Sequence, residues 1–157
     1  MTLRSKPRED CAHCNGSGII SVSKDPDEIA DCVCTDPPQR IQLSRRKGWR
    51  KPENTVVVAR PSKYGNPVRI VPVRKRGPFD LERDGVGFIG QNTDLEGARR
   101  SAVVRYRDML MNHPHLVQVT IDQIRAELAG KNLACWCRLD QPCHADVMLE
   151  IANGGTS

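Results

Sequence analysis

The chain has 157 residues, a formal net charge of +5 at pH 7 and seven cysteines. This length suits one domain with a hydrophobic core and a small appendage, and it excludes two large domains. No apolar run approaches the roughly 20 residues of a membrane-spanning helix, so we expect no membrane partner. An odd cysteine count without an apolar leader favours a reducing compartment, and we expect a cytoplasmic protein.

The first four cysteines have a spacing that is typical of a zinc site. Seventeen residues separate the pair Cys11 and Cys14 from the pair Cys32 and Cys34, so two tight loops can present four thiolates to one tetrahedral zinc ion. Residues 1–38 hold too few large apolar side chains to build a core, and the metal would have to supply their folding free energy. We therefore predict a zinc-binding knuckle over residues 1–38.

Residues 39–53 are predicted to form a basic linker between this knuckle and the main domain. From Arg40 to Lys51 the chain carries six lysines and arginines, no acidic residue, and Trp49. Such a stretch suits contact with phosphate, and a solvated linker is the alternative.

Residues 54–153 are predicted to form an α/β domain with a small, mainly parallel sheet and covering helices, followed by a tail at 154–157. The β-branched run at 55–59 predicts a central strand that is covered on both faces. Residues 68–73 predict an edge strand, because Pro72 cannot donate to a strand ladder. The turn-rich stretch 77–90 is predicted to be loop.

The segment that follows the first strand, residues 60–67, is a candidate anion-binding loop. It gathers a guanidinium, a hydroxyl, an ammonium and an amide around Gly65, from Arg60, Ser62, Lys63 and Asn66. Donors of these kinds can share the oxygens of a phosphoryl group. The alternative is a turn whose prolines and glycine serve geometry while its charges face water.

Start and stop signals then predict the helices and the last strand. Capping boxes at Thr93 and Thr120 each begin a helix; the first ends before His113, and Gly130 stops the second. A short apolar strand is expected at 133–136, and Pro142 is expected to open a last helix.

The remaining three cysteines form a second cluster, in which Cys135, Cys137 and Cys143 precede His144. All four side chains can close a structural zinc site, whereas the three thiolates alone can hold zinc with an open position or an iron–sulfur cluster. A cysteine nucleophile with His144 as base and a set of inert buried thiols remain open. The candidate catalytic residues are Cys137, Cys143, His144 and Asp146.

The two motif-bearing loops are predicted to lie at one edge of the sheet. A strand–helix–strand crossover favours parallel neighbours, so the segments 60–67 and 137–144 should both leave the carboxyl edge, where ligand sites form. Lys63 or Asn66 is then expected to lie on the order of 10 Å from Cys137 or Cys143.

The segments 59–67, 130–137 and 141–146 resemble an uncharacterised family of short domains common in bacteriophages and bacteria. The resemblance covers about residues 42–153 and implies a compact α/β domain in a phage-like setting, which would place the protein in the host cytoplasm. It implies no reaction. The four-cysteine segment departs from that family, and its residues 11–18 are similar to one zinc repeat of DnaJ-type chaperones.

Together these patterns favour a metal-containing enzyme that acts on a nucleotide or nucleic acid. The loop at 60–67 would hold phosphate beside a cysteine and histidine centre at 135–146. Two alternatives remain, a non-catalytic zinc-containing protein that binds nucleic acid and a module that docks a host protein. Steep weakening of binding with salt would separate phosphate recognition from a hydrophobic protein dock.

We predict that Cys14→Ser unfolds the N-terminal knuckle locally, because this segment has no core to replace the metal. The loss of one zinc per chain, together with faster amide exchange over residues 1–36, checks this. Protection that persists in those residues after chelation of the metal would contradict it.

Overall fold

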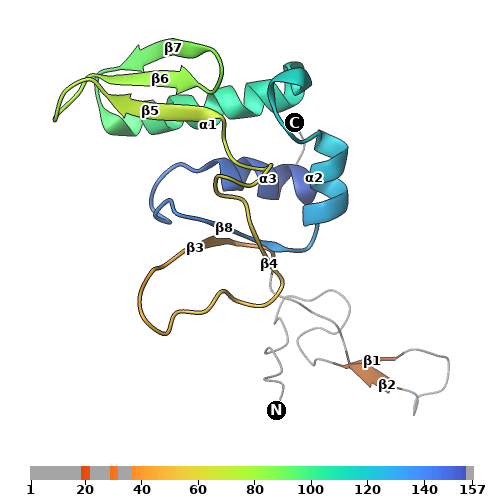
Figure 1. Cartoon of the computed structure of the whole chain (residues 1–157). Coiled ribbons are helices and arrows are strands. Elements are labelled where there is room, and N and C mark those ends of the chain that lie inside the picture. The colour runs from red at the N-terminus through yellow and green to blue at the C-terminus, as the bar shows by residue number, and fades with distance from the viewer. Residues whose placement is uncertain (1–18, 22–28, 32–36, 155–157) are drawn as a thin grey trace. The chain divides into compact units, whose positions relative to one another are not determined.

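The computed structural model describes residues 19–21, 29–31 and 37–154, and the chain divides into two compact units, Met1–Pro37 and Pro38–Ser157 (Figure 1). In the first unit, β1 (Ile19–Ser21) pairs antiparallel with β2 (Ile29–Asp31). The cysteines of the predicted knuckle, Cys11, Cys14, Cys32 and Cys34, lie outside the described residues.

The second unit is an α/β domain built on a three-stranded parallel sheet. Its central strand is β8 (Asn132–Cys135), with β3 (Arg40–Gln42) on one side and β4 (Thr55–Val57) on the other. Leu133 and Ala134 of β8 are fully buried. The predicted parallel arrangement is confirmed.

Two details of this sheet differ from the sequence-based expectation. The strand predicted to be central is the edge strand β4, because the apolar run continues past it into buried Val58 and Ala59 while Val57 is 38% exposed. The stretch predicted to be a linker supplies β3, a strand of three mixed residues whose partner is more than 90 positions away in β8.

A separate antiparallel sheet contains β5 (Val68–Pro72), β6 (Phe79–Arg83) and β7 (Gly87–Asn92), in that order. The prediction of an edge strand at 68–73 is confirmed. The prediction of loop at 77–90 is wrong, because β6 and most of β7 form a hairpin there. Gly85 and Gly87 close its turn with positive φ angles, and only Leu81 of β6 is fully buried, so the strand pattern is weak.

Three helices follow, α1 (Leu95–Asn112), α2 (Ile121–Leu128) and α3 (His144–Ala152), with a single 3₁₀ turn at Pro114–Leu116. The capping box at Thr120 is present, with hydrogen bonds in both directions between Thr120 and Gln123. At α1 the cap is Asp94 instead of Thr93, because the Asp94 carboxylate accepts the Gly97 amide at 2.7 Å.

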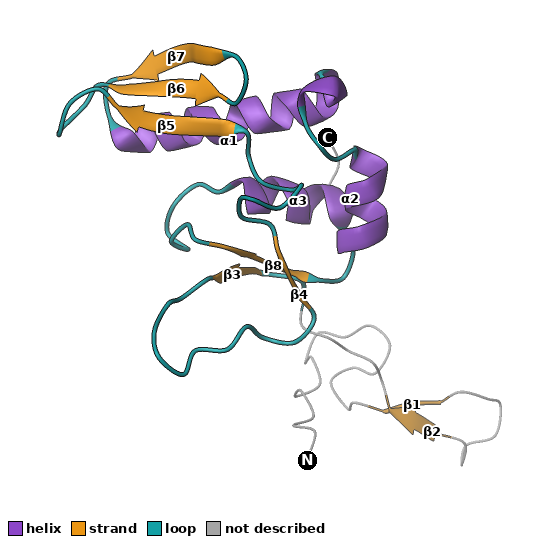
Figure 2. Cartoon of the chain, in the orientation of Figure 1, coloured by secondary structure: helices purple, strands orange, loops and turns teal. Residues whose placement is uncertain are grey.

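The helices lie on one side of the parallel sheet in the view of Figure 2. Helix α3 packs on β8, α1 packs on both α3 and the antiparallel sheet, and α2 packs on α3. The main core joins Tyr106, Leu110, Ile124, Leu128, Leu133 and Met148. Among the described residues, no helix is long and apolar enough to cross a membrane.

Candidate functional site

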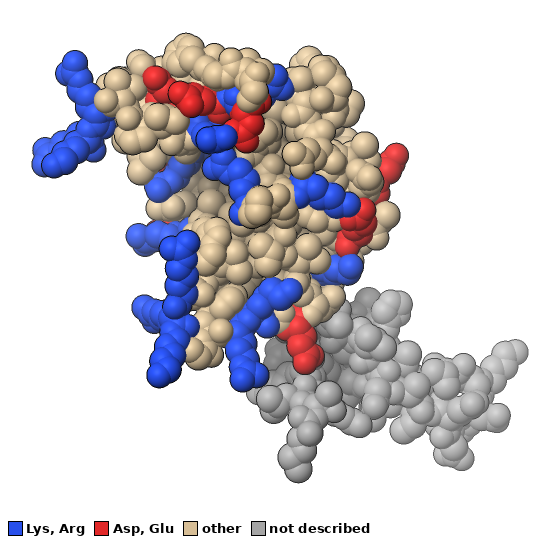
Figure 3. Space-filling view, in the orientation of Figure 1, with Lys and Arg blue, Asp and Glu red and all other residues tan. Residues whose placement is uncertain are grey.

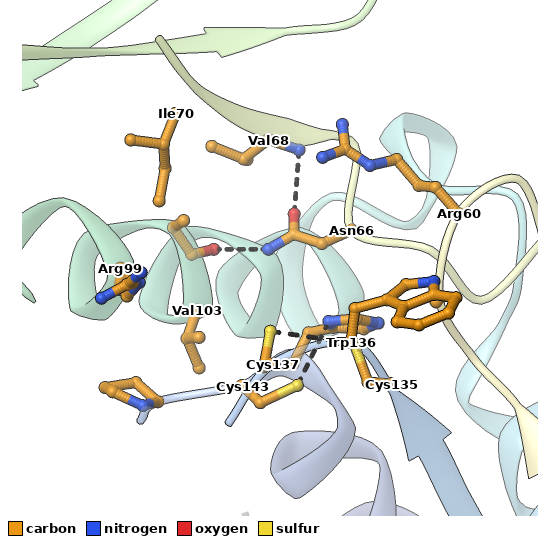
Figure 4. Close-up of a pocket in the computed structure, with 14 residues that line it drawn as sticks. Arg60, Asn66, Val68, Ile70, Arg99, Val103, Cys135, Trp136, Cys137 and Cys143 are labelled. Carbon is orange, nitrogen blue, oxygen red and sulfur yellow. Dashed lines mark hydrogen bonds between the residues drawn. The ribbon is translucent and has the colours of Figure 1, made fainter. Parts of the chain in front are cut away.

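The two motif-bearing loops line one pocket of about 330 Å³ at the carboxyl edge of the parallel sheet. Arg60 and Asn66 come from the loop after β4, and Cys137 and Cys143 come from the segment between β8 and α3. Val68 and Ile70 of β5 and Arg99 and Val103 of α1 complete the opposite wall (Figure 4). The order of the strands therefore brings together residues more than 70 positions apart.

The three cysteines of this segment converge and can hold a metal ion. Their sulfur atoms all lie within 4.8 Å of one another, and the Sγ atoms of Cys135 and Cys137 are 3.8 Å apart. A tetrahedral zinc site with Zn–S bonds of about 2.3 Å requires sulfur atoms about 3.8 Å apart. The protein thus presents ligands at the spacing of one ion.

Local structure explains why each thiol points inward. Cys135 is the last residue of the buried central strand, and Cys143 is the N-cap of α3, where its sulfur accepts the Ala145 amide at 3.5 Å. Cys137 lies between these two elements and is half-buried. A helix N-terminus favours a thiolate, so this position suits a metal ligand as well as a reactive cysteine.

The thiols share protons through mutual hydrogen bonds. Hydrogen bonding with Cys137 and Cys143 holds the pKa of the Cys135 thiol far below its usual range. The pKa values of Cys137 and Cys143 are raised, chiefly by their hydrogen bonds with Cys135. The three groups therefore titrate as one coupled unit.

His144 is adjacent to the cluster but is occupied by a structural bond. Its Nε2 lies 2.9 Å from the Val58 carbonyl oxygen, which fixes Nε2 as the donor. Nδ1 lies 3.7 Å from the Cys143 sulfur, and the ring packs edge-on against Tyr106. The group of side chains that can hold one ion contains the three cysteines and not His144, whose role here is to fix α3 to the end of β4.

The phosphate-loop residues divide between the pocket and the structure around it. Arg60 lines the pocket and is exposed. Asn66 also lines it, but its amide donates to the Ala102 carbonyl and accepts the Val68 amide, so it ties the loop to α1 and β5 (Figure 4). Lys63 does not line this pocket and pairs with Glu127 of α2 at 2.7 Å.

Ser62 and Gly65 also serve the loop's own geometry. Ser62 does not line the cysteine pocket; it lines a separate depression near Leu116, and its buried hydroxyl has no hydrogen-bond partner among the described residues. A Cβ at Gly65 would come within 2.6 Å of the Arg60 side chain and 3.1 Å of its backbone. Gly65 therefore allows the loop to close against Arg60.

Sequence reasoning did not identify three side chains at this site. Arg99 of α1 faces the pocket from the side opposite Arg60, and Trp136, which is 48% exposed, lies to the right of the cysteines in Figure 4. The Arg45 guanidinium lies 4.7 Å from the centre of the Trp136 ring. The sequence feature that could have indicated Arg99 was its spacing from Ala102 and Val103, which places the three residues on one face of the helix.

Arg40 fixes the loop that carries the cysteines. Its side chain is only 8% exposed, and its guanidinium donates to the carbonyl oxygens of Arg138, Leu139 and Gln141. It also donates to the Asp146 carboxylate at 2.7 Å. Asp146, a candidate catalytic residue by sequence, is absent from the pocket lining, and partial burial raises its pKa. Its observed partner is Arg40.

Residues 41–154 match a protein family described as Domain of unknown function (DUF4326). The chain belongs to this family. No curated protein and no solved structure gives a significant match. The uncharacterised family expected from the motif loops is confirmed, and because its description carries no activity, the function of this DUF4326 domain must be inferred from its site.

We predict that Arg40→Met loosens the cysteine loop of the DUF4326 domain. Loss of hydrogen bonds to a charged group costs about 1.5–3 kcal/mol each, so Cys137 and Cys143 should react roughly tenfold faster or more with iodoacetamide in the reduced, metal-free protein. Mass spectrometry of the labelled peptides measures this. Arg138→Met is the matched control, because Arg138 is 67% exposed and pairs within the loop. Equal rates in both variants would contradict the role of Arg40.

Proposed function

We propose that this DUF4326 domain is an enzyme that binds a nucleotide, free or within a nucleic acid, beside a zinc ion held by Cys135, Cys137 and Cys143. The observation that carries the proposal is the composition of one pocket. It combines three converging thiols with two arginines and an exposed tryptophan, and the described residues that line it include no carboxylate.

Zinc is favoured over the other interpretations of the three thiols. A single nucleophile needs one cysteine and a base, and it gives no reason for three sulfur atoms within 4.8 Å of one another. In a 4Fe–4S cluster each thiolate binds a different iron atom, so the thiolates stand further apart than the ligands of one ion. Cysteine sulfur at a tetrahedral spacing suits zinc.

The charges of the pocket favour an anionic ligand. Arg60 and Arg99 lie on opposite sides of the cysteines (Figure 4), and a guanidinium binds the oxygens of a phosphate in a fork. Because no acidic side chain lines the pocket, neither arginine is neutralised there by the described part of the chain. A phosphate can contact one arginine or bridge both.

The size and the tryptophan favour a nucleotide among anions. A volume of about 330 Å³ is at the small end of the range for ligand pockets and suits one nucleotide. Trp136 lines the pocket and is 48% exposed, and stacking of a base on an aromatic ring contributes about 1–3 kcal/mol. Arg45 on the Trp136 ring holds this stacking surface in place.

Three protein ligands leave one position of a tetrahedral zinc ion open, where the metal polarises a bound oxygen or lowers the pKa of a bound water molecule. The residues of this chain then have separate tasks. The arginines hold phosphate, Trp136 orients the base, and the buried sulfur atoms lie beneath the ligand. This arrangement suits a hydrolytic reaction at the nucleotide.

A non-catalytic nucleic-acid-binding domain is the second candidate, and one observation favours it. The polar atoms of Asn66 and the Nε2 of His144 are committed to structural hydrogen bonds, and the pocket lining lacks Asp and Glu in the described residues. A general base would then have to come from metal-bound solvent, a thiolate or the Nδ1 of His144, which lies beside the Cys143 sulfur. Without such a group, the same pocket only binds.

Metal analysis tests the zinc ion directly. In a Cys11→Ser, Cys14→Ser background, which removes the predicted N-terminal site, we expect one zinc per chain, and none after the further change Cys137→Ser. Cobalt substitution should give thiolate-to-metal absorption, and inorganic phosphate should change its visible bands if the open position faces the pocket. A metal-free background protein, or a brown one that contains iron, would overturn the zinc assignment.

Arg99→Met tests nucleotide binding. Loss of a hydrogen bond to a charged group costs about 1.5–3 kcal/mol, so affinity for nucleoside monophosphates should fall roughly 10- to 100-fold. Titration calorimetry on the zinc-loaded protein measures the change. Arg100→Met is the matched control, because the adjacent Arg100 pairs with Glu96 and does not line the pocket. Equal affinities in the two variants would contradict a ligand at this site.

A further inference from the structure

Two clusters of exposed basic residues flank the pocket. The loop between β3 and β4 carries Arg45, Arg46, Lys47 and Arg50, and the turn between β5 and β6 carries Arg74, Lys75 and Arg76. None of these seven side chains forms an ion pair with an acidic residue of the described part of the chain. Their positive charge is therefore available to a partner.

The contacts of the pocket place it between the two clusters. Arg45 of the first cluster stacks on Trp136, which lines the pocket. Ile70 of β5 lines the opposite wall, and the strand runs from there into Arg74. Figure 3 shows lysine and arginine side chains along one side of the visible face, from the β5–β6 turn at the top to the β3–β4 loop at the bottom.

The distance between the pocket and the second cluster exceeds the reach of one nucleotide. Arg74 is four positions after Ile70, and an extended strand rises about 3.3 Å per residue, so Arg74 lies about 13 Å along the chain from the pocket wall. A mononucleotide that is held by Arg60 and Arg99 leaves the three cations of the 74–76 turn without a phosphate. A ligand that uses both clusters must continue on both sides of the pocket.

The charge of the chain is concentrated in this unit. Residues 38–157 contain twenty lysines and arginines against twelve aspartates and glutamates, whereas residues 1–37 are acidic. A basic surface on a domain with a small anion pocket is the electrostatic pattern of a nucleic-acid-binding protein.

We infer that the pocket takes a nucleotide that is part of a single-stranded nucleic acid, whose flanking phosphates contact the 45–50 loop on one side and the 74–76 turn on the other. This inference rests on the proposed function and names its substrate class. A base within a duplex cannot reach Cys135 and Cys143, which are 4% and 1% exposed, without leaving the stack. Exposed Trp136 and Trp49 offer the aromatic surfaces on which bases of a single strand stack.

Fluorescence anisotropy on the zinc-loaded full chain tests this with four probes: mixed-sequence 12-nucleotide DNA, its RNA counterpart, the 12-base-pair duplex, and the nucleoside monophosphates as competitors. We expect a single strand to bind at least tenfold more tightly than any monophosphate and than the duplex. Comparison of the DNA and RNA probes shows which kind of single strand is preferred.

Two charge variants and a matched control localise the contacts. Arg46→Ser with Lys47→Ser, and Arg74→Ser with Arg76→Ser, should each weaken single-strand binding at least tenfold. Each should also reduce the slope of log K against log salt by about 1.4, since each phosphate contact on a single strand contributes about 0.7. Monophosphate affinity should stay unchanged. Arg125→Ser with Lys131→Ser removes the same charge from α2 and the opposite edge of β8 and should change neither affinity.

The outcomes separate the inference from the proposed function. Monophosphate binding with no gain for the longer strands, or equal effects of all three double variants, would overturn the inference and leave the proposed function standing. Duplex binding as tight as single-strand binding would overturn the single-strand requirement. Loss of every nucleotide-dependent signal in the zinc-loaded protein would overturn the proposed function and the inference with it.

Discussion

A buried guanidinium sets the geometry on which the site depends. Arg40 is the first residue of β3, yet all its acceptors lie about 100 positions later, in the segment between β8 and α3. Burial of a charge is costly unless its donors are satisfied, and here three carbonyl oxygens and a carboxylate satisfy them. The hydrogen bonds of Arg40 therefore stabilise one backbone conformation of the loop between Cys137 and Cys143. In that conformation the sulfur atoms converge.

Other polar side chains connect the pocket walls to one another. His144 joins α3 to the end of β4, Asn66 joins the 60–67 loop to α1 and β5, and the Tyr106 hydroxyl donates to the Tyr64 carbonyl at 3.0 Å. These bonds hold the pocket in shape before any ligand arrives, which lowers the ordering cost of binding. These hydrogen bonds also occupy polar groups that the sequence analysis had suggested as ligand contacts. Thiols, arginines and a tryptophan remain for the proposed ligand.

The sequence predicted those features that local chemistry determines. The capping box at Thr120, the edge position of β5 and the shared sheet edge followed from caps, proline and strand order. It did not predict features that depend on distant partners. Strand β3 forms because β8 pairs with it. The structural role of Arg40 depends on hydrogen bonds to distant carbonyl groups, which no local sequence pattern identifies. Spacing alone left five roles open for the second cysteine cluster, and the convergence of the three sulfur atoms in the structure favours a metal.

The charges of the proposed centre explain why the thiols and arginines belong to one site. Zinc with three thiolates carries one net negative charge, which alone would repel a phosphate. Arg60 and Arg99 on either side reverse that sign, so the loaded pocket is slightly positive and a phosphate that carries up to about two negative charges brings it close to neutral. In the proposed function the two groups would depend on each other, because the arginines would attract the anion and the metal would supply the reactive position. The 60–67 and 137–143 segments, far apart in sequence, therefore depend on the parallel sheet that brings their strands side by side.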